Sequence, residues 1–137
     1  MCAEKEINMD WVEALPSQCP PTDAFPPEGV YYRAVSTDCS EGDFIPYARL
    51  YPTRQYIGSR ACTARALSIY TNQDDCVKAT MLPALQKLGQ TSIAKVTLTK
   101  KDGLVQKGHN IDSHHSWWRT RVFDLNTSVE LINATAK

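Results

Sequence analysis

The chain has 137 residues, of which 15 are Lys or Arg and 15 are Asp or Glu, and 42% are hydrophobic. This composition is typical of one globular domain and excludes collagen, a coiled coil and a wholly disordered chain. No stretch approaches the roughly 20 consecutive apolar residues that a membrane-spanning helix requires, so we expect no membrane partner.

The first predicted feature is a proline-rich arm, residues 1–29, ahead of a body that comprises residues 30–137. Two Pro-Pro pairs exclude a regular helix or a central strand over residues 16–29. Before them, apolar residues recur at helical spacing, which indicates a short helix that docks through Trp11. The arm holds one Lys and six acidic residues, whereas the body holds 14 basic and nine acidic residues. The zero net charge is therefore the sum of an arm of −5 and a body of +5.

The body begins with a predicted strand over residues 30–35, a run rich in β-branched and aromatic residues. Residues 36–65 are predicted to be mostly irregular, and a second strand is predicted over residues 66–71. A helix capped by Asn72 follows. We expect Pro83 to break or kink this helix, because proline cannot donate the interior hydrogen bond but suits a first helical position.

The rest of the body is predicted to consist mainly of strands. Residues 94–99 alternate between apolar and polar, which is typical of a half-exposed strand. The turn signal Lys101-Asp102-Gly103 predicts a hairpin whose second arm is residues 104–106. Residues 117–123 and 127–132 predict two further strands. The predicted fold class is therefore α+β: a single domain with a mainly antiparallel sheet, one kinked or split helix and the proline-rich arm.

The five cysteines, at positions 2, 19, 39, 62 and 76, are scattered and odd in number, with no CxxC spacing. Such a pattern indicates reduced thiols and a cytoplasmic location. Cys62 lies between Arg60 and Arg65 in the sequence, and nearby cations lower a thiol pKa, so Cys62 is one candidate nucleophile.

A first candidate ligand site is the loop from Tyr47 to Arg65, which alternates arginines and tyrosines and has no acidic residue. Guanidinium groups bind phosphate, and aromatic rings stack on bases, so this combination suits a nucleotide or single-stranded nucleic acid. The alternative is a solvated loop whose arginines pair with acids elsewhere. The candidate ligand-binding residues here are Arg49, Tyr51, Arg54, Tyr56, Arg60 and Arg65.

A second candidate site is the segment from His109 to Arg119, which contains all three histidines and two of the three tryptophans. If His114 and His115 lie in a strand, one faces inward and the other outward, and an imidazole held by Asp112 suits proton transfer near neutral pH. Trp117 and Trp118 are candidate ligand contacts or core residues. The histidines and Asp112 also offer metal-binding atoms, but their spacing matches no zinc motif, so no metal site is predicted.

Three short segments carry a resemblance to a known fold: residues 30–35, residues 66–72 with the helix that follows, and residues 129–132. Together they resemble the skeleton of the ADP-ribosyltransferase-like fold, in which an Arg or His, a Ser, Thr or Tyr, and a Glu on successive strands surround NAD. The resemblance implies that Arg33 holds the phosphates, that Ser68 or Tyr70 shapes the nicotinamide pocket and that Glu130 stabilises the ribosyl cation. The last of the three segments, residues 129–132, lacks the paired Glu-x-Glu of that family.

Three functions follow as hypotheses. The preferred one is a small cytoplasmic, non-catalytic module that binds a phosphate-bearing ligand, a nucleotide or nucleic acid, or else a protein. The second is a nucleotide-acting enzyme, with NAD as candidate cofactor and with Arg33, Ser68 and Glu130, or His114 or His115 as acid-base group, in catalysis. The third is an adaptor that docks on a protein partner through its arm.

Overall fold

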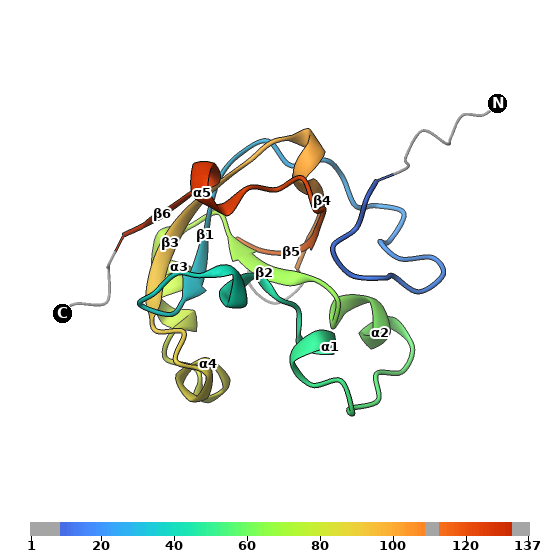
Figure 1. Ribbon diagram of the computed structural model, residues 1–137, viewed down its shortest axis with the longest axis horizontal. Helices are drawn as coiled ribbons and strands as arrows, with labels where there is room; N and C mark the ends of the chain where they lie inside the picture. Colours follow the sequence, from blue (N-terminus) through green and yellow to red (C-terminus); the bar gives the residue numbers. More distant parts are fainter. Residues whose placement is uncertain (1–8, 109–112, 133–137) are drawn as a thin grey trace.

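Six strands form one antiparallel sheet in the order β4-β5-β2-β1-β3-β6 in the computed structural model, which describes residues 9–108 and 113–132 (Figure 1). The strands are β1 (Gly29–Val35), β2 (Leu67–Tyr70), β3 (Ser92–Leu98), β4 (Gly103–Lys107), β5 (His114–Arg119) and β6 (Val129–Leu131). The sheet and its helices confirm the predicted α+β domain. The predicted strands at residues 30–35, 66–71 and 94–99 correspond to β1, β2 and β3.

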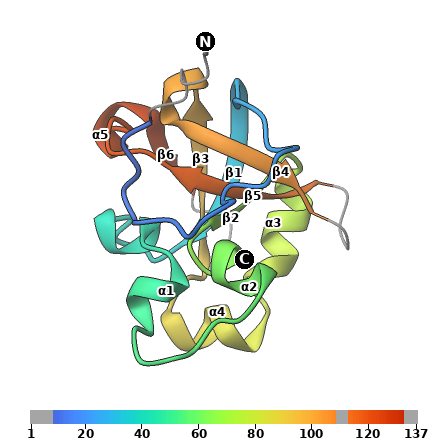
Figure 2. The ribbon, with the colours of Figure 1, turned by 90° about the vertical axis from the view of Figure 1, so that its right-hand side faces the viewer.

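Short helices lie around this sheet. They are α1 (Tyr47–Leu50), α2 (Ser59–Thr63), α3 (Gln73–Ala79), α4 (Pro83–Leu88) and α5 (Leu125–Ser128), with 3-10 turns η2 (Glu41–Phe44) and η3 (Lys100–Asp102). The prediction of an irregular segment over residues 36–65 missed α1 and α2, because helices of four and five residues are too short to show a period of 3.6. In the two ribbon views α1, α2 and α4 all lie below the sheet, with α4 apart from α1 and α2 in Figure 1 (Figures 1 and 2).

The split helix is confirmed. The side chain of Asn72 accepts a hydrogen bond of 3.1 Å from the backbone N–H of Asp75, which caps α3. Pro83 begins α4, and Gly89 ends it with a φ of 74°, a left-handed conformation that favours glycine. The chain therefore turns between α3 and α4, and α4 lies below the sheet (Figure 2).

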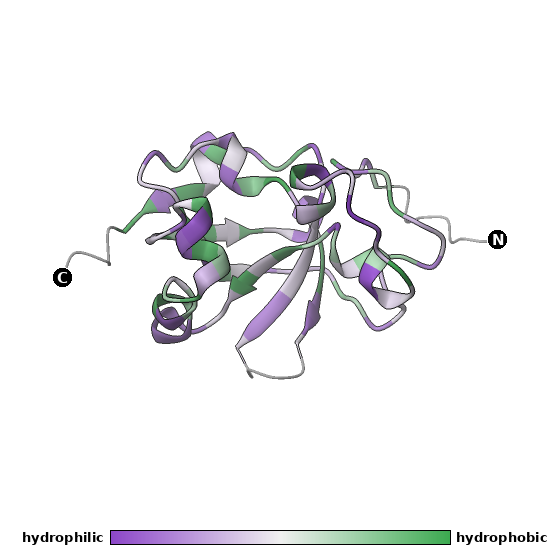
Figure 3. Cartoon of the chain, turned by 90° about the horizontal axis from the view of Figure 1, so that it is seen from below, coloured by the Kyte–Doolittle hydropathy of each residue, from purple (hydrophilic) through white to green (hydrophobic). Residues whose placement is uncertain are grey.

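The two faces of the sheet have different partners. One face packs into the larger hydrophobic core, where the buried aromatic and aliphatic residues are Tyr31, Val35, Phe44, Leu67, Ile69, Ala94, Val96, Leu98, Val105, Trp117 and Phe123. The opposite face packs against α3 through a smaller cluster made by Ala34, Tyr70, Cys76, Ala79 and Ile93. The helices carry hydrophilic residues beside the hydrophobic ones (Figure 3). The second face is thus only partly filled, and the candidate site lies there.

The predicted hairpin after residue 99 is wrong. β4 pairs with β5, with Val105 opposite Trp117, whereas β3 lies three places further along the sheet. A turn does lie at this point, because η3 covers Lys100–Asp102 and Gly103 follows it with a φ of 142°. The chain leaves the neighbourhood of β3 at this point, and a local pattern carries no information on which strand becomes the partner.

The described part of the arm, residues 9–28, contains no helix, so the expected short helix is not found there. Trp11 forms an isolated β-bridge with Thr120, and Phe25 forms another with Val105 of β4. Phe25 and Val105 exchange two backbone hydrogen bonds of 2.8 Å. The arm therefore follows the body closely and adds backbone pairing at its edge.

A disulfide joins Cys19 in the arm to Cys62 in α2, across 43 positions of the sequence. This bond corrects the expectation of reduced thiols, and it also removes Cys62 as a nucleophile, because a bonded sulfur has no thiolate to offer. Among the described residues Cys39 and Cys76 are free. None of the helices in the described ranges has the length and apolar character needed to cross a membrane.

Candidate functional site

A cavity of about 490 Å³ opens on the partly filled face of the sheet. Its floor is made by β1, β2 and β5, and its walls by the segment from Ile45 to Ala66 and by α4. Four candidates from the resemblance and from the segment His109–Arg119 line it: Arg33, Ser68, Tyr70 and His114. Three more come from the loop Tyr47–Arg65, the Arg/Tyr loop: Arg54, Tyr56 and Arg60. The cavity thus brings together residues from three candidate sites that are separate in the sequence.

Arg33 is buried at the edge of this cavity, with an exposed fraction of 8%. Its Nε donates to the backbone carbonyl of Asp43 at 2.9 Å, and its Nη1 donates to the carbonyl of Ser68 at 2.7 Å. Burial lowers the pKa of Arg33 to about 10, although the Asp43 carboxylate opposes that shift. Because Arg33 remains charged at neutral pH, it provides a fixed cation beside Ser68.

The side chains of Ser68 and His114 lie within hydrogen-bonding distance in the cavity. Ser68 is exposed although it lies in an interior strand of the sheet, because its side chain faces the cavity. Nε2 of His114 lies 3.0 Å from Oγ of Ser68, and the Tyr70 ring packs against the His114 ring at a centroid distance of 5.2 Å and an interplanar angle of 50°. The contact between Tyr70 and His114 follows from the register of β2 and β5, in which these two residues are opposite each other. With its proton on Nδ1, the imidazole accepts the hydroxyl proton of Ser68, as general-base catalysis requires.

Burial, helped by the neighbouring His115, lowers the pKa of His114 below its ordinary value of 6.5. The unfolded chain therefore binds more protons than the folded chain between the two pKa values, so the free energy of unfolding falls as the pH drops through 6.5. We expect urea denaturation to show a larger loss of stability between about pH 7.5 and pH 5.5 in the native chain than in His114→Asn. Equal losses would contradict the assigned environment of His114.

The neighbouring His115 points to the opposite face, as the alternation of a strand predicts. It is buried, its Nδ1 lies 2.9 Å from the carbonyl of Ser113, and its ring meets the rings of Phe25 and Tyr31 edge to face. His115 is therefore a core residue, away from the cavity. His109 and Asp112, together with the predicted contact between Asp112 and an imidazole, lie outside the described residues.

Glu130 is not brought to the cavity. It is exposed on β6, opposite Lys95 of β3, and three strand spacings separate β6 from β2 in the sheet. Three spacings amount to about 14 Å. Arg33, Ser68 and Tyr70 thus line one cavity, whereas Glu130 is not among its lining residues. Within the described ranges, no three metal-binding side chains gather to hold an ion.

The remaining members of the Arg/Tyr loop serve the structure. Arg49 forms an ion pair of 2.8 Å with Glu13 of the arm, and its guanidinium also donates to the carbonyl of Val12. Arg65 donates to the carbonyl of Ala61 in α2. The ring of Tyr51 lies beneath the guanidinium of Arg54, 4.4 Å from its centroid. The loop is therefore divided, with some cations facing the cavity and others anchoring the chain.

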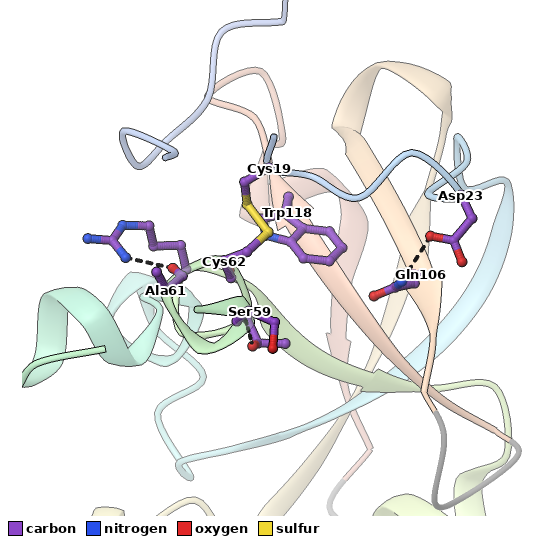
Figure 4. Close-up of a disulfide and its surroundings, with 9 residues drawn as sticks. Cys19, Asp23, Ser59, Ala61, Cys62, Gln106 and Trp118 are labelled. Carbon is purple, nitrogen blue, oxygen red and sulfur yellow. Dashed lines mark hydrogen bonds between the residues drawn. A yellow bond between two sulfur atoms is a disulfide. The ribbon is translucent and has the colours of Figure 1, made fainter. Parts of the chain in front are cut away.

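The two tryptophans are also divided. Trp117 is fully buried in the larger core and donates through Nε1 to the carbonyl of Asp102 at 3.0 Å. Trp118 lies on the other face and donates to the carbonyl of Cys62, beside the disulfide (Figure 4). Trp117 is therefore a core residue, whereas Trp118 supports α2 and lines the second of two cavities on this face.

A second cavity, of about 840 Å³, adjoins the first. The two share four lining residues: Thr63, Tyr70, His114 and Ser116. Neither cavity has an Asp or Glu among its described lining residues, whereas the first has Arg33, Arg54 and Arg60 and the second has Lys107. The chain as a whole has as many acidic as basic residues, yet the described lining of both cavities is basic. This charge distribution gives both cavities a positive field that attracts anions.

Sequence reasoning missed several lining residues. Ser116 follows His114 by two positions in β5, so the alternation of a strand predicts the same face for both once β5 is known. Gln90, which is buried and lies 3.5 Å from the Asp43 carboxylate, gave no signal. Gln106 and Lys107 line the second cavity because β4 pairs with β5, and the sequence did not predict that pairing.

Comparison with known proteins returned no match: no protein-family model, no curated protein and no solved structure resembles this chain closely enough to be reported.

Proposed function

We propose that this protein binds a nucleotide in the first cavity, with its phosphate beside the arginines and its base against the tyrosines. The observation that carries the proposal is the absence of carboxylates, among the described residues, from a cavity lined by three arginines. Charge-assisted bonds from guanidinium groups to phosphate are among the strongest polar contacts in proteins. The hydrogen bonds of the described residues use Nε and Nη1 of Arg33, which leaves its Nη2 for a ligand.

Tyrosine rings complete this binding site. Tyr47 and Tyr56 line the cavity, and the hydroxyl of Tyr56 donates weakly to the carbonyl of Tyr47 at 3.3 Å, which keeps the two close. Tyr70 is buried, and that burial raises the pKa of its phenol, so the ring is neutral at physiological pH. Stacking of a base on such a ring contributes about 1–3 kcal/mol. The cavity of about 490 Å³ is within the range of small-ligand sites.

We expect the double substitution Arg54→Ala/Arg60→Ala to weaken AMP binding about 10- to 100-fold, because each arginine offers a charge-assisted bond to phosphate. Isothermal titration calorimetry at low salt measures the change. The matched control is Arg49→Ala/Arg65→Ala, which removes two arginines of the same loop that bind the protein itself. Failure of the native chain to bind AMP, or an equal loss in the control, would contradict the proposal.

A second candidate function is a nucleotide-acting enzyme, with NAD as its cofactor or substrate. It is favoured by the contact between Ser68 and His114, which places an acid-base group beside the proposed phosphate site. Here His114 takes the role of acid-base group, and Glu130, at the far end of the sheet, has none. Chromatography after incubation with NAD separates the two candidates, because a binding module leaves NAD intact and an enzyme releases nicotinamide.

The adaptor function has less in its favour, because the described part of the arm is bound to the body at both ends, near Val12 and Phe25, and at Cys19 between them. The cytoplasmic location rested on reduced cysteines, and the Cys19–Cys62 bond removes that argument, since disulfides persist mainly in oxidising compartments. The compartment would instead set the oxidation state of this bond.

A further inference from the structure

The second cavity has three walls of different origin. One wall is the end of β4 with the facing part of β5, which supplies Gln106, Lys107, Ser116 and Trp118. Another is α2 with Gly58 before it, and the third is the arm, through Ser17, Gln18 and Pro21. The disulfide lies where the last two walls meet, with Cys19 above Cys62 and Trp118 (Figure 4).

The arm wall is positioned by the disulfide. Upstream, the N–H of Val12 donates to the carbonyl of Arg119 at 3.0 Å, and downstream Phe25 pairs with Val105. Asp23 also accepts a hydrogen bond of 2.9 Å from Gln106, at an exposed position. Between Glu13 and Asp23, the only bond from the described residues of this loop to the rest of the chain is Cys19–Cys62.

The lining of the second cavity is polar and carries one cation. Hydroxyls of Ser17, Ser59, Thr63 and Ser116 and the amides of Gln18 and Gln106 surround it, and Lys107 is its charged group. Hydroxyls and amides match the hydroxyls of a sugar, and a lysine matches a phosphate. The shared residues Tyr70 and His114 place this cavity directly beside the proposed nucleotide site.

We propose that the second cavity is a subsite for the sugar and phosphate of a second nucleotide unit, and that the Cys19–Cys62 disulfide is required to assemble it. This inference rests on the proposed nucleotide site. The ligand class is then a short single-stranded oligonucleotide, whose first unit occupies the arginine-lined cavity. Reduction of the disulfide releases the middle of the arm loop and removes one wall of the subsite, while the first cavity keeps its walls.

The test compares AMP with the 5′-phosphorylated dinucleotide pApA by calorimetry. In the oxidised protein we expect pApA to bind at least about tenfold more tightly than AMP, because it adds one charge-assisted bond and several neutral ones. Reduction with dithiothreitol, or the variant Cys19→Ser, should reduce pApA affinity to that of AMP and leave AMP affinity unchanged. Lys107→Ala should also remove the advantage of pApA, whereas Lys100→Ala, at an exposed position outside both cavities, should not.

The outcomes separate the two proposals. If AMP binds but pApA binds no more tightly in the oxidised protein, the subsite is overturned and the nucleotide site stands. If the advantage of pApA survives both reduction and Cys19→Ser, the role of the disulfide is overturned. If neither compound binds in any state, the nucleotide site itself is wrong and the subsite falls with it. Circular dichroism of Cys19→Ser confirms that the body remains folded, so that a lost advantage reports on the subsite.

Discussion

Replacing Arg33 by alanine should lower the free energy of unfolding by about 3–5 kcal/mol, because a buried charge and two charge-assisted hydrogen bonds are lost together. The guanidinium connects three parts of the chain: β1, the carbonyl of Asp43 and the carbonyl of Ser68 in β2. It also lies 5.5 Å from the centroid of the Phe44 ring. Urea denaturation followed by tryptophan fluorescence measures the loss.

The control for this prediction is Arg54→Ala, which removes an exposed arginine from the same cavity and should cost less than about 1 kcal/mol. Arg33→Lys keeps the charge but cannot place donors on both carbonyls, so it should recover only part of the stability. If Arg33→Ala and Arg54→Ala cost the same, Arg33 does not hold the floor of the cavity.

Gly103→Ala should destabilise the protein by about 3 kcal/mol or more, because crowding and backbone strain add at this position. Gly103 has a φ of 142°, which side chains rarely adopt, and a Cβ there would overlap the backbone oxygen of Trp118 and lie 2.8 Å from Nε1 of Trp117. The expected consequence is separation of β4 from β5, or failure to fold.

Gly29→Ala is the matched control, because Gly29 has a similar φ of 132° but open space where its Cβ would lie. It should cost only the backbone strain, about 1–2 kcal/mol. Thermal unfolding of the two variants separates crowding from strain. Equal midpoints in the two variants would show that β4 moves away from Trp118 without cost.

The elements that the sequence predicted well are those with local causes. β1 and β2 follow from runs of β-branched and aromatic residues, and the break before α4 follows from the ring of Pro83. The opposite orientations of His114 and His115 follow from the alternation of a strand. Each of these statements needs only the residues within one element.

What failed depends on pairing across the chain. The hairpin prediction assumed that neighbours in sequence are neighbours in the sheet, whereas β4 pairs with β5. The resemblance assigns Glu130 a catalytic role because it lies on the last strand of the chain. The strand order places that strand, β6, at the edge of the sheet that is farthest from β4 and β5. The partner of Cys19 lies 43 positions away, and spacing alone does not specify such a pair. The cavity is therefore visible only once β1, β2 and β5 are placed side by side.

The bridge between Phe25 and Val105 also bears on self-association of the chain. β4 is the last strand at its end of the sheet, and an unpaired terminal strand attracts a strand from another molecule. Phe25 occupies both backbone groups of Val105 and so blocks addition of a further strand at that residue. A chain that began at Gly29 would keep every lining residue of the first cavity but present a bare strand edge, and its tendency would be to aggregate.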